Sequence, residues 1–273
     1  MRTLLLVHAH PDDEAISTGG VMARAHDEGT RVVLVTCTGG EVGEIHNMDE
    51  AATRPRLAEV RRAELEEAGR ILGVDRLVRL GYRDSGMAGT GDNDHVASFH
   101  RASLEEAAGR VAEIIREERP QVVVTYGEDG VYGHPDHVKA HHVTLRAVDV
   151  VRAEGIRVRL YMVAVPRTAL REMAERMRAA GLATPFDEPG SPAALISGTP
   201  DEEITTVVDV LAYVDRKRRA FAAHVSQNAP GSFFLNTPAG IFEEAFGTEH
   251  FVLAGGAEPG GGPERDLFAA VPS

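Results

Sequence analysis

The sequence lacks the features that point to disulfides, nucleic acid or membranes. Its single cysteine, Cys37, allows no disulfide within the chain and no thiolate metal cluster. Tryptophan is absent, no basic run occurs, and the net charge of −13 disfavours binding to nucleic acid or to an anionic membrane. No segment approaches the roughly 20 apolar residues of a membrane span. The N-terminal segment "MRTLLLVHAH" has too few apolar residues for a secretory signal. We therefore expect a cytoplasmic protein.

Short apolar runs alternate with helical patterns along the first part of the chain. The apolar runs predict buried strands at 3–7, 31–38, 76–82, 121–127 and 157–165. Between them, helices are predicted at 17–29, 56–74, 102–120 and 134–155, the first of them capped by Ser17 or Thr18. This order predicts an α/β, Rossmann-like fold whose mainly parallel, doubly wound sheet carries helices on both faces.

The last third of the chain is less regular. It predicts helices at 169–181 and 211–227, a strand at 204–210, and an edge strand in "EHFVLAGG" (249–256). Residues 185–203 and 255–273 are rich in proline and glycine, and the second of these segments is predicted to be a flexible tail. We expect one domain over 1–254, with a core at 1–165 and a less regular part at 166–254.

Two segments that concentrate titratable side chains follow predicted strands. "HAHPDDE" (8–14) comes after the first strand, and "VYGHPDH" (131–137) comes after the fourth. In open α/β sheets, ligands bind at the carboxyl ends of the strands. If the two strands are near neighbours, the two segments meet in one cleft.

The residue types in these segments predict a catalytic metal site. His10, Asp13 and His137 would supply two imidazoles and one carboxylate, a set that suits catalytic zinc with an open position. Ferrous iron uses the same set, so the ligands leave the metal open between Zn²⁺ and Fe²⁺. A metal held in this way can activate water near neutral pH.

The remaining motif residues suit proton transfer. Consecutive side chains point in different directions, so Asp12 can stay free as a general base while Asp13 binds the metal. A protonated His134 would stabilise an oxyanion and donate a proton to a leaving amine, and Asp136 could orient an imidazole. Singly, each motif could instead be a capped turn that starts a helix. Two His-Pro-Asp tripeptides, each at a strand end, favour the catalytic interpretation.

These motifs resemble those of the LmbE-like, or N-acetylglucosaminyl-phosphatidylinositol deacetylase, family. "AHPDDE" and "HPDH" are both intact, and the similarity covers about residues 1–165. The resemblance implies a Rossmann-like, usually zinc-dependent amide hydrolase that deacetylates N-acetylglucosamine-type conjugates. It implies the roles given above for the motif residues, and it implies that Tyr132 helps to polarise the amide carbonyl.

A narrower resemblance concerns the substrate. "YRDSGMAGT" (82–90) looks like the branch that deacetylates N-acetylglucosaminyl-inositol in mycothiol biosynthesis, which implies that Asp84 and Met87 bind the sugar. Arg61 is the best match for a substrate-binding arginine, although a solvated helix charge is an equal alternative. Ser17 stands where the related mycothiol S-conjugate amidases carry lysine, and we place it among the substrate-binding residues. Gly133, where those amidases tend to have proline, also favours the deacetylase branch.

Three functions therefore remain open. The first is deacetylation of a small amino-sugar conjugate, the second is the S-conjugate amidase reaction, and the third is a non-catalytic sugar- or metal-binding protein. Intact Asp12 and His134 argue against the third, because a binding protein needs neither a base nor an acid. Residues 39–56 and 231–246 match neither enzyme branch and could shape the pocket. Homo-oligomerisation is compatible with the sequence.

Overall fold

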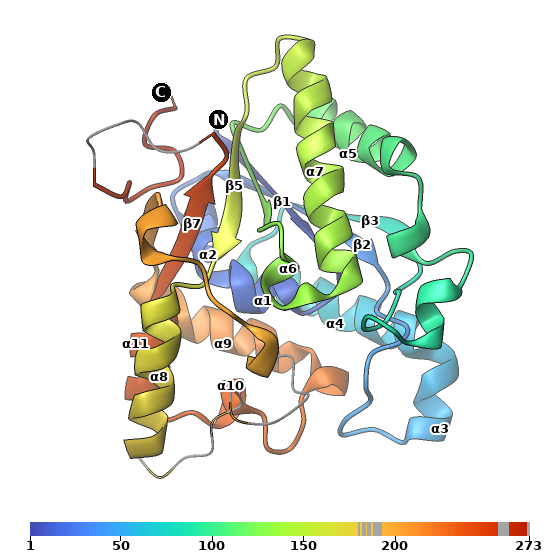
Figure 1. The fold of residues 1–273 in the computed structure, drawn as a ribbon, viewed down its shortest axis with the longest axis vertical. Coiled ribbons are helices and arrows are strands. Elements are labelled where there is room, and N and C mark those ends of the chain that lie inside the picture. Colours follow the sequence, from blue (N-terminus) through green and yellow to red (C-terminus); the bar gives the residue numbers. More distant parts are fainter. Residues whose placement is uncertain (180, 182–183, 185–186, 188–192, 256–261, 272–273) are drawn as a thin grey trace.

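Seven strands form one sheet in the computed structural model, which describes residues 1–179, 181, 184, 187, 193–255 and 262–271. The strand order is β3-β2-β1-β4-β5-β7-β6 (Figure 1). The strands are β1 Thr3–His8, β2 Arg31–Thr38, β3 Arg76–Tyr82, β4 Val122–Tyr126, β5 Arg159–Ala164, β6 Thr206–Asp209 and β7 Thr248–Leu253. The first five pair in parallel, and β7 is antiparallel to both of its neighbours. The predicted α/β sheet is confirmed.

Helices cover both faces because both faces of the sheet are apolar. Along β1, Leu4 and Leu6 pack into one core, while Leu5 and Val7 pack into the other. The first core includes side chains of α2 Gly19–Asp27, α4 Leu57–Leu72 and α9 Val214–Ala223, and the second includes α5 Leu104–Glu118 and α7 Pro135–Ala153. The other α-helices are α1 Asp13–Ser17, α3 Glu50–Thr53, α6 Gly130–Gly133, α8 Arg167–Ala179, α10 Phe233–Asn236 and α11 Ala239–Phe246.

The two motif loops leave neighbouring strands. β1 pairs directly with β4, in the register that sets Leu4 opposite Val122. From β1 the chain crosses to β2 on one side, whereas from β4 it crosses to β5 on the other. This reversal is the switch point at which doubly wound sheets form their ligand crevice. The condition for one shared cleft is therefore met.

The C-terminal third differs from the sequence-based prediction in two places. β7 does not lie at the edge of the sheet but between β5 and β6, because it pairs with both, and its buried Phe251 contributes to the core. Residues 262–271, which we predicted to belong to a flexible tail, pack against the domain. Leu267 and Phe268 are buried, and Glu264 accepts hydrogen bonds from Arg159.

The helix predicted at 17–29 is split at Thr18, and its cap comes from a distant strand. Thr18 gives no side-chain cap to α2, and its hydroxyl lies 2.8 Å from His8 Nε2 instead. The Glu249 carboxylate accepts hydrogen bonds from the first amides of α2, and it also accepts one from Lys217 Nζ at 2.7 Å. A carboxylate is favourable at a helix N-terminus. This contact ties β7 and α9 to the helix that follows the first motif.

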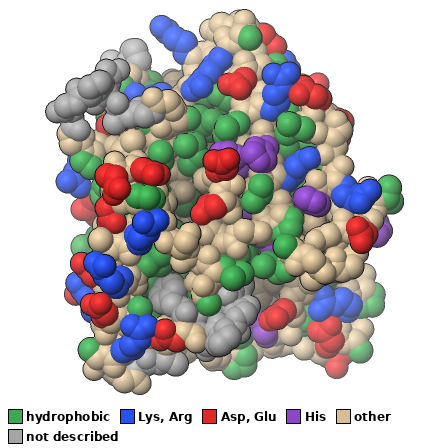
Figure 2. Space-filling view, viewed as in Figure 1, with side chains coloured by type: hydrophobic (Ala, Val, Ile, Leu, Met, Phe, Trp, Pro, Cys, Tyr) green, Lys and Arg blue, Asp and Glu red, His purple; other side chains and the backbone are tan. Residues whose placement is uncertain are grey.

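The surface carries both signs of charge. Figure 2 shows acidic and basic side chains interspersed over the face in view. None of the helices in the described part of the chain is long and apolar enough to cross a membrane.

Candidate active site

The first motif loop holds Asp13 in place through its own backbone and a strand residue. The His10 amide donates to Asp13 Oδ2 at 2.8 Å, and the Tyr126 hydroxyl donates to the same oxygen at 2.8 Å. Tyr126, the last residue of β4, also accepts a hydrogen bond from the amide of Ala9. The carboxylate of Asp13 is therefore fixed by the two strands that flank the switch point.

The second motif places His137 on the first turn of α7. His134 caps this helix and Pro135 is its first residue, a position that needs no amide donor. The ring of His137 stacks on Tyr126 with centroids 4.2 Å apart, and its Nδ1 lies 3.1 Å from the Gly130 carbonyl. Gly130 has a φ of 63°, and a Cβ there would lie 2.7 Å from the His137 Cβ. Glycine is therefore required for this approach.

His10, Asp13 and His137 meet at one point. His10 Nδ1 lies 3.2 Å from His137 Nε2. The two carboxylate oxygens of Asp13 lie 3.4 Å from His10 Nδ1 and 3.3 Å from His137 Nε2. The structure thus brings together the three side chains that the motifs assigned to a metal.

The hydrogen-bond partners of the two imidazoles show which nitrogens are free. A carbonyl oxygen only accepts, so the Gly130 carbonyl assigns the proton of neutral His137 to Nδ1 and leaves a lone pair on Nε2. His10 Nε2 faces Asp136 Oδ2 at 3.2 Å, which leaves the His10 lone pair on Nδ1. Two lone pairs and a carboxylate then face one another in a buried space. Such a donor set fits a divalent cation.

The electrostatic surroundings also favour a cation. Burial lowers the pKa of His10, but Asp84, Asp13 and Asp136 outweigh burial and raise it well above its ordinary value. These three carboxylates give the site a negative potential, which also attracts a metal ion. His134 contributes a further nitrogen that lies within 4.8 Å of ligand atoms of His10 and His137.

Asp12 and Asp13 face different partners. Asp12 has a φ of 104°, in the left-handed region, where residues other than glycine are strained and often functional. Its Oδ2 lies 3.1 Å from Arg61 Nη2, whereas the Asp13 carboxylate turns to His10 and His137. Burial raises the pKa of Asp12 to about 6, against the attraction of Arg61.

Arg61 is not a solvated helix charge, because only 3% of it is exposed. Besides Asp12, its guanidinium donates to the carbonyls of Pro11 and Gly40. A Cβ at Gly40 would lie 2.1 Å from Arg61 Nη1, so glycine gives the guanidinium its space. The structure therefore connects Arg61 to the motif loop itself.

His134 differs from its predicted protonation state. Its Nδ1 accepts a hydrogen bond from the Asp136 amide at 3.1 Å, which leaves Nε2 as the donor of the neutral ring. Burial, with added repulsion from His10 and His137, lowers its pKa to about 3. We expected a protonated His134, and the structure instead favours a neutral one, because its surroundings disfavour a second proton.

Asp136 and Tyr132 lie against the metal-site imidazoles. Asp136 faces His10 Nε2 and accepts hydrogen bonds from the amide and hydroxyl of Ser85. The Tyr132 ring centroid lies 4.9 Å from that of His137 and 6.1 Å from that of His134. Burial raises the pKa of Tyr132, so its hydroxyl stays protonated and can donate.

The predicted substrate residues are spread more widely. Asp84 reaches the cluster, with Oδ1 3.5 Å from His10 Nε2 and a hydrogen bond from the Gly86 amide. Met87 is half-buried three residues further on. Ser17 lies in the wall of a cavity of about 600 Å³, which is also lined by Ile16 at the end of α1, by α8 and by α11. Ser17 is therefore not part of the imidazole cluster.

Sequence reasoning missed several contact partners of the motif residues. Tyr126 was assigned only to a strand, Ser85 only to the "RDSGM" resemblance, and Glu14 and His224 received no role. Glu14 Oε1 lies 2.6 Å from His224 Nε2, and both side chains are fully buried. Burial opposes a proton on His224, but Glu14 and Asp12 outweigh it and raise its pKa. The one available signal was the position of Tyr126 at a strand end.

Comparison with known proteins places these observations in a family. A family model described as PIG-L, GlcNAc-PI de-N-acetylase, matches residues 5–148. The 1D-myo-inositol 2-acetamido-2-deoxy-alpha-D-glucopyranoside deacetylase of Acidothermus cellulolyticus is 48% identical over 281 residues, spanning 99% of this chain and 96% of its own. The protein of the same name from Thermobifida fusca is 44% identical over 285 residues, spanning 98% and 99%.

A solved structure shares the fold. The N,N'-diacetylchitobiose deacetylase from Pyrococcus horikoshii superimposes with a TM-score of 0.61 at 22% identity, covering 92% of this chain and 83% of that one. The family model covers more than half of the chain, and the two sequence relatives match almost all of it. The resemblance inferred from the two motifs is thereby confirmed, and the chain belongs to the PIG-L, or GlcNAc-PI de-N-acetylase, family.

Proposed function

We propose that this protein hydrolyses the N-acetyl amide of N-acetylglucosaminyl-inositol in a zinc-dependent reaction that releases acetate and the free amine. The observation that carries the proposal is the buried cluster of His10, Asp13 and His137, with the separate carboxylate of Asp12 beside it. Near-full-length relatives at 48% and 44% identity bear the name of this deacetylase, which supports the choice of substrate.

His10, Asp13 and His137 would hold the metal ion. When bound there, zinc supplies Lewis-acid polarisation of the amide carbonyl and makes water more acidic. Fe²⁺ suits the same ligands, so both metals belong in any test. Neutral His10 donates through Nε2 to Asp136, and neutral His137 donates through Nδ1 to the Gly130 carbonyl, so the other nitrogen of each ring is unprotonated and faces the metal site.

Asp12 would act as the general base. Its carboxylate lies apart from the cluster, so it can take a proton from the attacking water on an oxygen that Arg61 does not occupy. Arg61, which bonds the backbone before Asp12 as well as its side chain, keeps this carboxylate in place. We therefore propose that the main role of Arg61 is to position Asp12, and that binding of the substrate is secondary.

His134 and Tyr132 would stabilise the oxyanion that forms on the acetyl carbonyl. Each offers one polarised donor, the Nε2–H of neutral His134 and the hydroxyl of Tyr132, and preorganised donors of this kind lower the barrier most effectively. A neutral imidazole has no second proton to release. We therefore assign proton delivery to Asp12, which returns the proton it took from water to the leaving amine.

The substrate is a small amino-sugar conjugate, and we place its hydroxyls against Asp84 and its less polar surface near Met87. Ser17 would contact the part of the substrate that extends toward the cavity between α1, α8 and α11. We propose the cytoplasm as the location of the reaction.

A comparison of substrates tests the proposal. Acetate release from N-acetylglucosaminyl-inositol should proceed with a kcat/KM at least about tenfold above amide cleavage of a mycothiol S-conjugate, because a pocket rejects a ligand that leaves its polar groups unpaired. The opposite ranking would favour the S-conjugate amidase. If the metal-loaded protein hydrolysed neither N-acetylglucosamine conjugates nor mycothiol S-conjugates, the binding-protein alternative would hold.

A further inference from the structure

Glu14 is a fully buried carboxylate next to the proposed metal ligand Asp13, and nothing in the proposed reaction uses it. Its two oxygens have different partners. Oε2 accepts a hydrogen bond from the Asp12 amide at 2.9 Å, and Oε1 lies 2.6 Å from His224 Nε2. Glu14 therefore connects the backbone of the proposed base to a histidine 210 residues further along the chain.

The Asp12 peptide needs such a support because its conformation is strained. A residue with a φ of 104° persists only where its surroundings hold it. On one side, Arg61 from α4 bonds the Pro11 carbonyl and the Asp12 carboxylate. On the other side, Glu14 bonds the Asp12 amide. Together these contacts fix the peptide that turns Asp12 and Asp13 in different directions.

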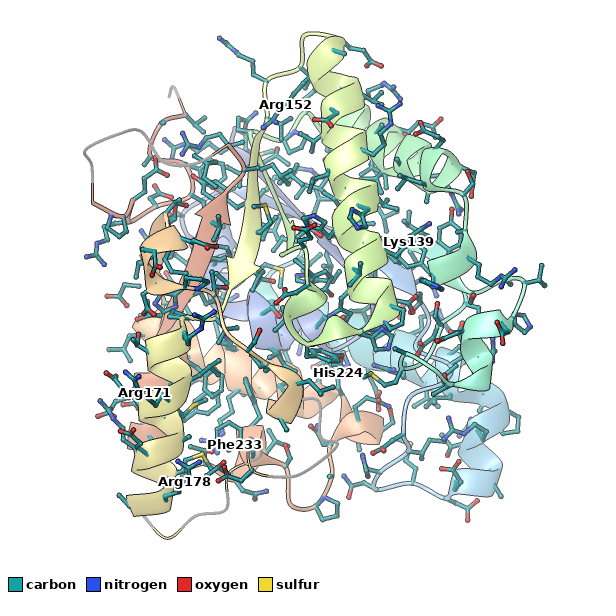
Figure 3. All side chains as sticks on the ribbon, viewed as in Figure 1. Lys139, Arg152, Arg171, Arg178, His224 and Phe233 are labelled. Carbon is teal, nitrogen blue, oxygen red and sulfur yellow. The ribbon has the colours of Figure 1, made fainter. Side chains whose placement is uncertain are left out.

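The side chain of His224 makes its polar contact with Glu14. It directly follows the last residue of α9, and it is labelled below α1 in Figure 3. Its side chain is fully buried, and within the described residues its Nδ1 has no hydrogen-bond partner. The contact from Nε2 to Glu14 is thus the polar link that this imidazole makes.

We propose that Glu14 and His224 form a positioning pair that holds the Asp12 backbone in its left-handed conformation and so keeps the Asp12 carboxylate available for proton transfer. This inference rests on the proposed function, because it assumes that Asp12 is the base. It also assigns a role in catalysis to the C-terminal part of the chain, through the end of α9. Neither residue would touch the substrate.

Substitution of His224 tests the pair. His224→Leu removes the donor to Glu14 and should lower kcat by at least about tenfold, since small misplacements of a catalytic group cost up to 10²-fold. KM and bound metal should change less than twofold. His224→Gln, whose amide nitrogen reaches about as far as Nε2, should restore kcat to at least about threefold above the leucine variant. Unchanged kcat in His224→Leu would overturn the proposal.

A neighbouring substitution controls for loss of stability. The Ser226 hydroxyl donates to Glu64 Oε2 at 2.7 Å, a buried contact two residues beyond His224 that does not reach the motif loop. Ser226→Ala should lower the melting temperature while kcat stays within twofold. If His224→Leu did not fold, His224→Asn, whose amide is one bond shorter than that of glutamine, would replace it. Equal kcat for the asparagine and glutamine variants would then overturn the proposal.

A double-mutant cycle separates this inference from the proposed function. If His224 acts only through Asp12, His224→Leu should lower kcat no further in a protein that already carries Asp12→Ala. An equal further loss in that background would show that His224 acts by another route. Full activity of Asp12→Ala alone would instead refute the proposed base, whereas an inactive Asp12→Ala beside a fully active His224→Leu would refute only the positioning pair.

Discussion

Replacing Asp12 with asparagine should lower kcat at least about 10²-fold while the bound metal remains. Asparagine keeps the shape of the side chain and an oxygen that can accept from Arg61, and it tolerates the left-handed backbone at this position. What it loses is the ability to take a proton from water. Asp12→Ala should be at least as slow, because alanine loses the Arg61 contact as well and fits a φ of 104° less well. Acetate release and metal content would be measured on the same preparations.

Asp49 offers a matched control. Like Asp12 it stands directly before a helix, and its carboxylate accepts a hydrogen bond from the Ala52 amide at the surface. Asp49→Asn makes the same chemical change outside the site, so kcat should stay within about twofold. A fully active Asp12→Asn protein with unchanged metal content would show that another group removes the proton.

The fold was predictable from the sequence where its signals are local. Strands buried on both faces appear as continuous apolar runs, and the alternation of such runs with helical patterns predicts a parallel sheet. The strand pairing of the C-terminal third was not predictable in the same way. β7 pairs with β5 and β6 through contacts between distant segments, and the short β6, not β7, occupies the edge.

The same contrast holds within the site. The spacing of "HPDD" and "HPDH" predicted which residues would meet, because each motif lies at the start of a helix in the connection that follows β1 or β4. Tyr126 and His224, by contrast, contact motif residues 113 and 210 positions away. No local pattern announces such contacts. The protonation of His134 was missed for a related reason, since it depends on how deeply neighbouring elements bury the ring.

Asp12 and Asp13 are neighbours in the sequence, but the fold gives their carboxylates different partners. The two are consecutive residues, and like charges so close would repel each other. The left-handed turn at Asp12 separates them, giving one to Arg61 and the other to the imidazoles. The turn is held from α4 through Arg61 and, in our proposal, from α9 through His224 and Glu14. Segments far from the motif in sequence would thus determine what the motif can do.

Replacing His137 with alanine should abolish stable metal binding and lower kcat/KM at least about 10³-fold, because a metal ion supplies several kcal/mol of charge stabilisation in such reactions. Removal of the metal from the unsubstituted protein with a chelator should have the same effect. Addition of Zn²⁺, or of Fe²⁺ under anaerobic conditions, should restore activity. The higher of the two restored activities identifies the better catalytic metal. Metal content per chain would be measured beside acetate release.

His141 provides the matched control for this change, because it lies one helical turn further along α7 and is also buried. Its Nδ1 bonds the Tyr126 carbonyl at 2.9 Å and takes no part in the cluster with His10 and Asp13. His141→Ala should therefore retain one metal ion per chain and lose stability rather than metal. If His137→Ala kept its metal and its activity while His141→Ala lost both, the assignment of His137 as a metal ligand would be wrong, and His141 would take its place in the ligand set. The lone pair that the Gly130 carbonyl leaves on His137 Nε2 is the reason to expect the opposite.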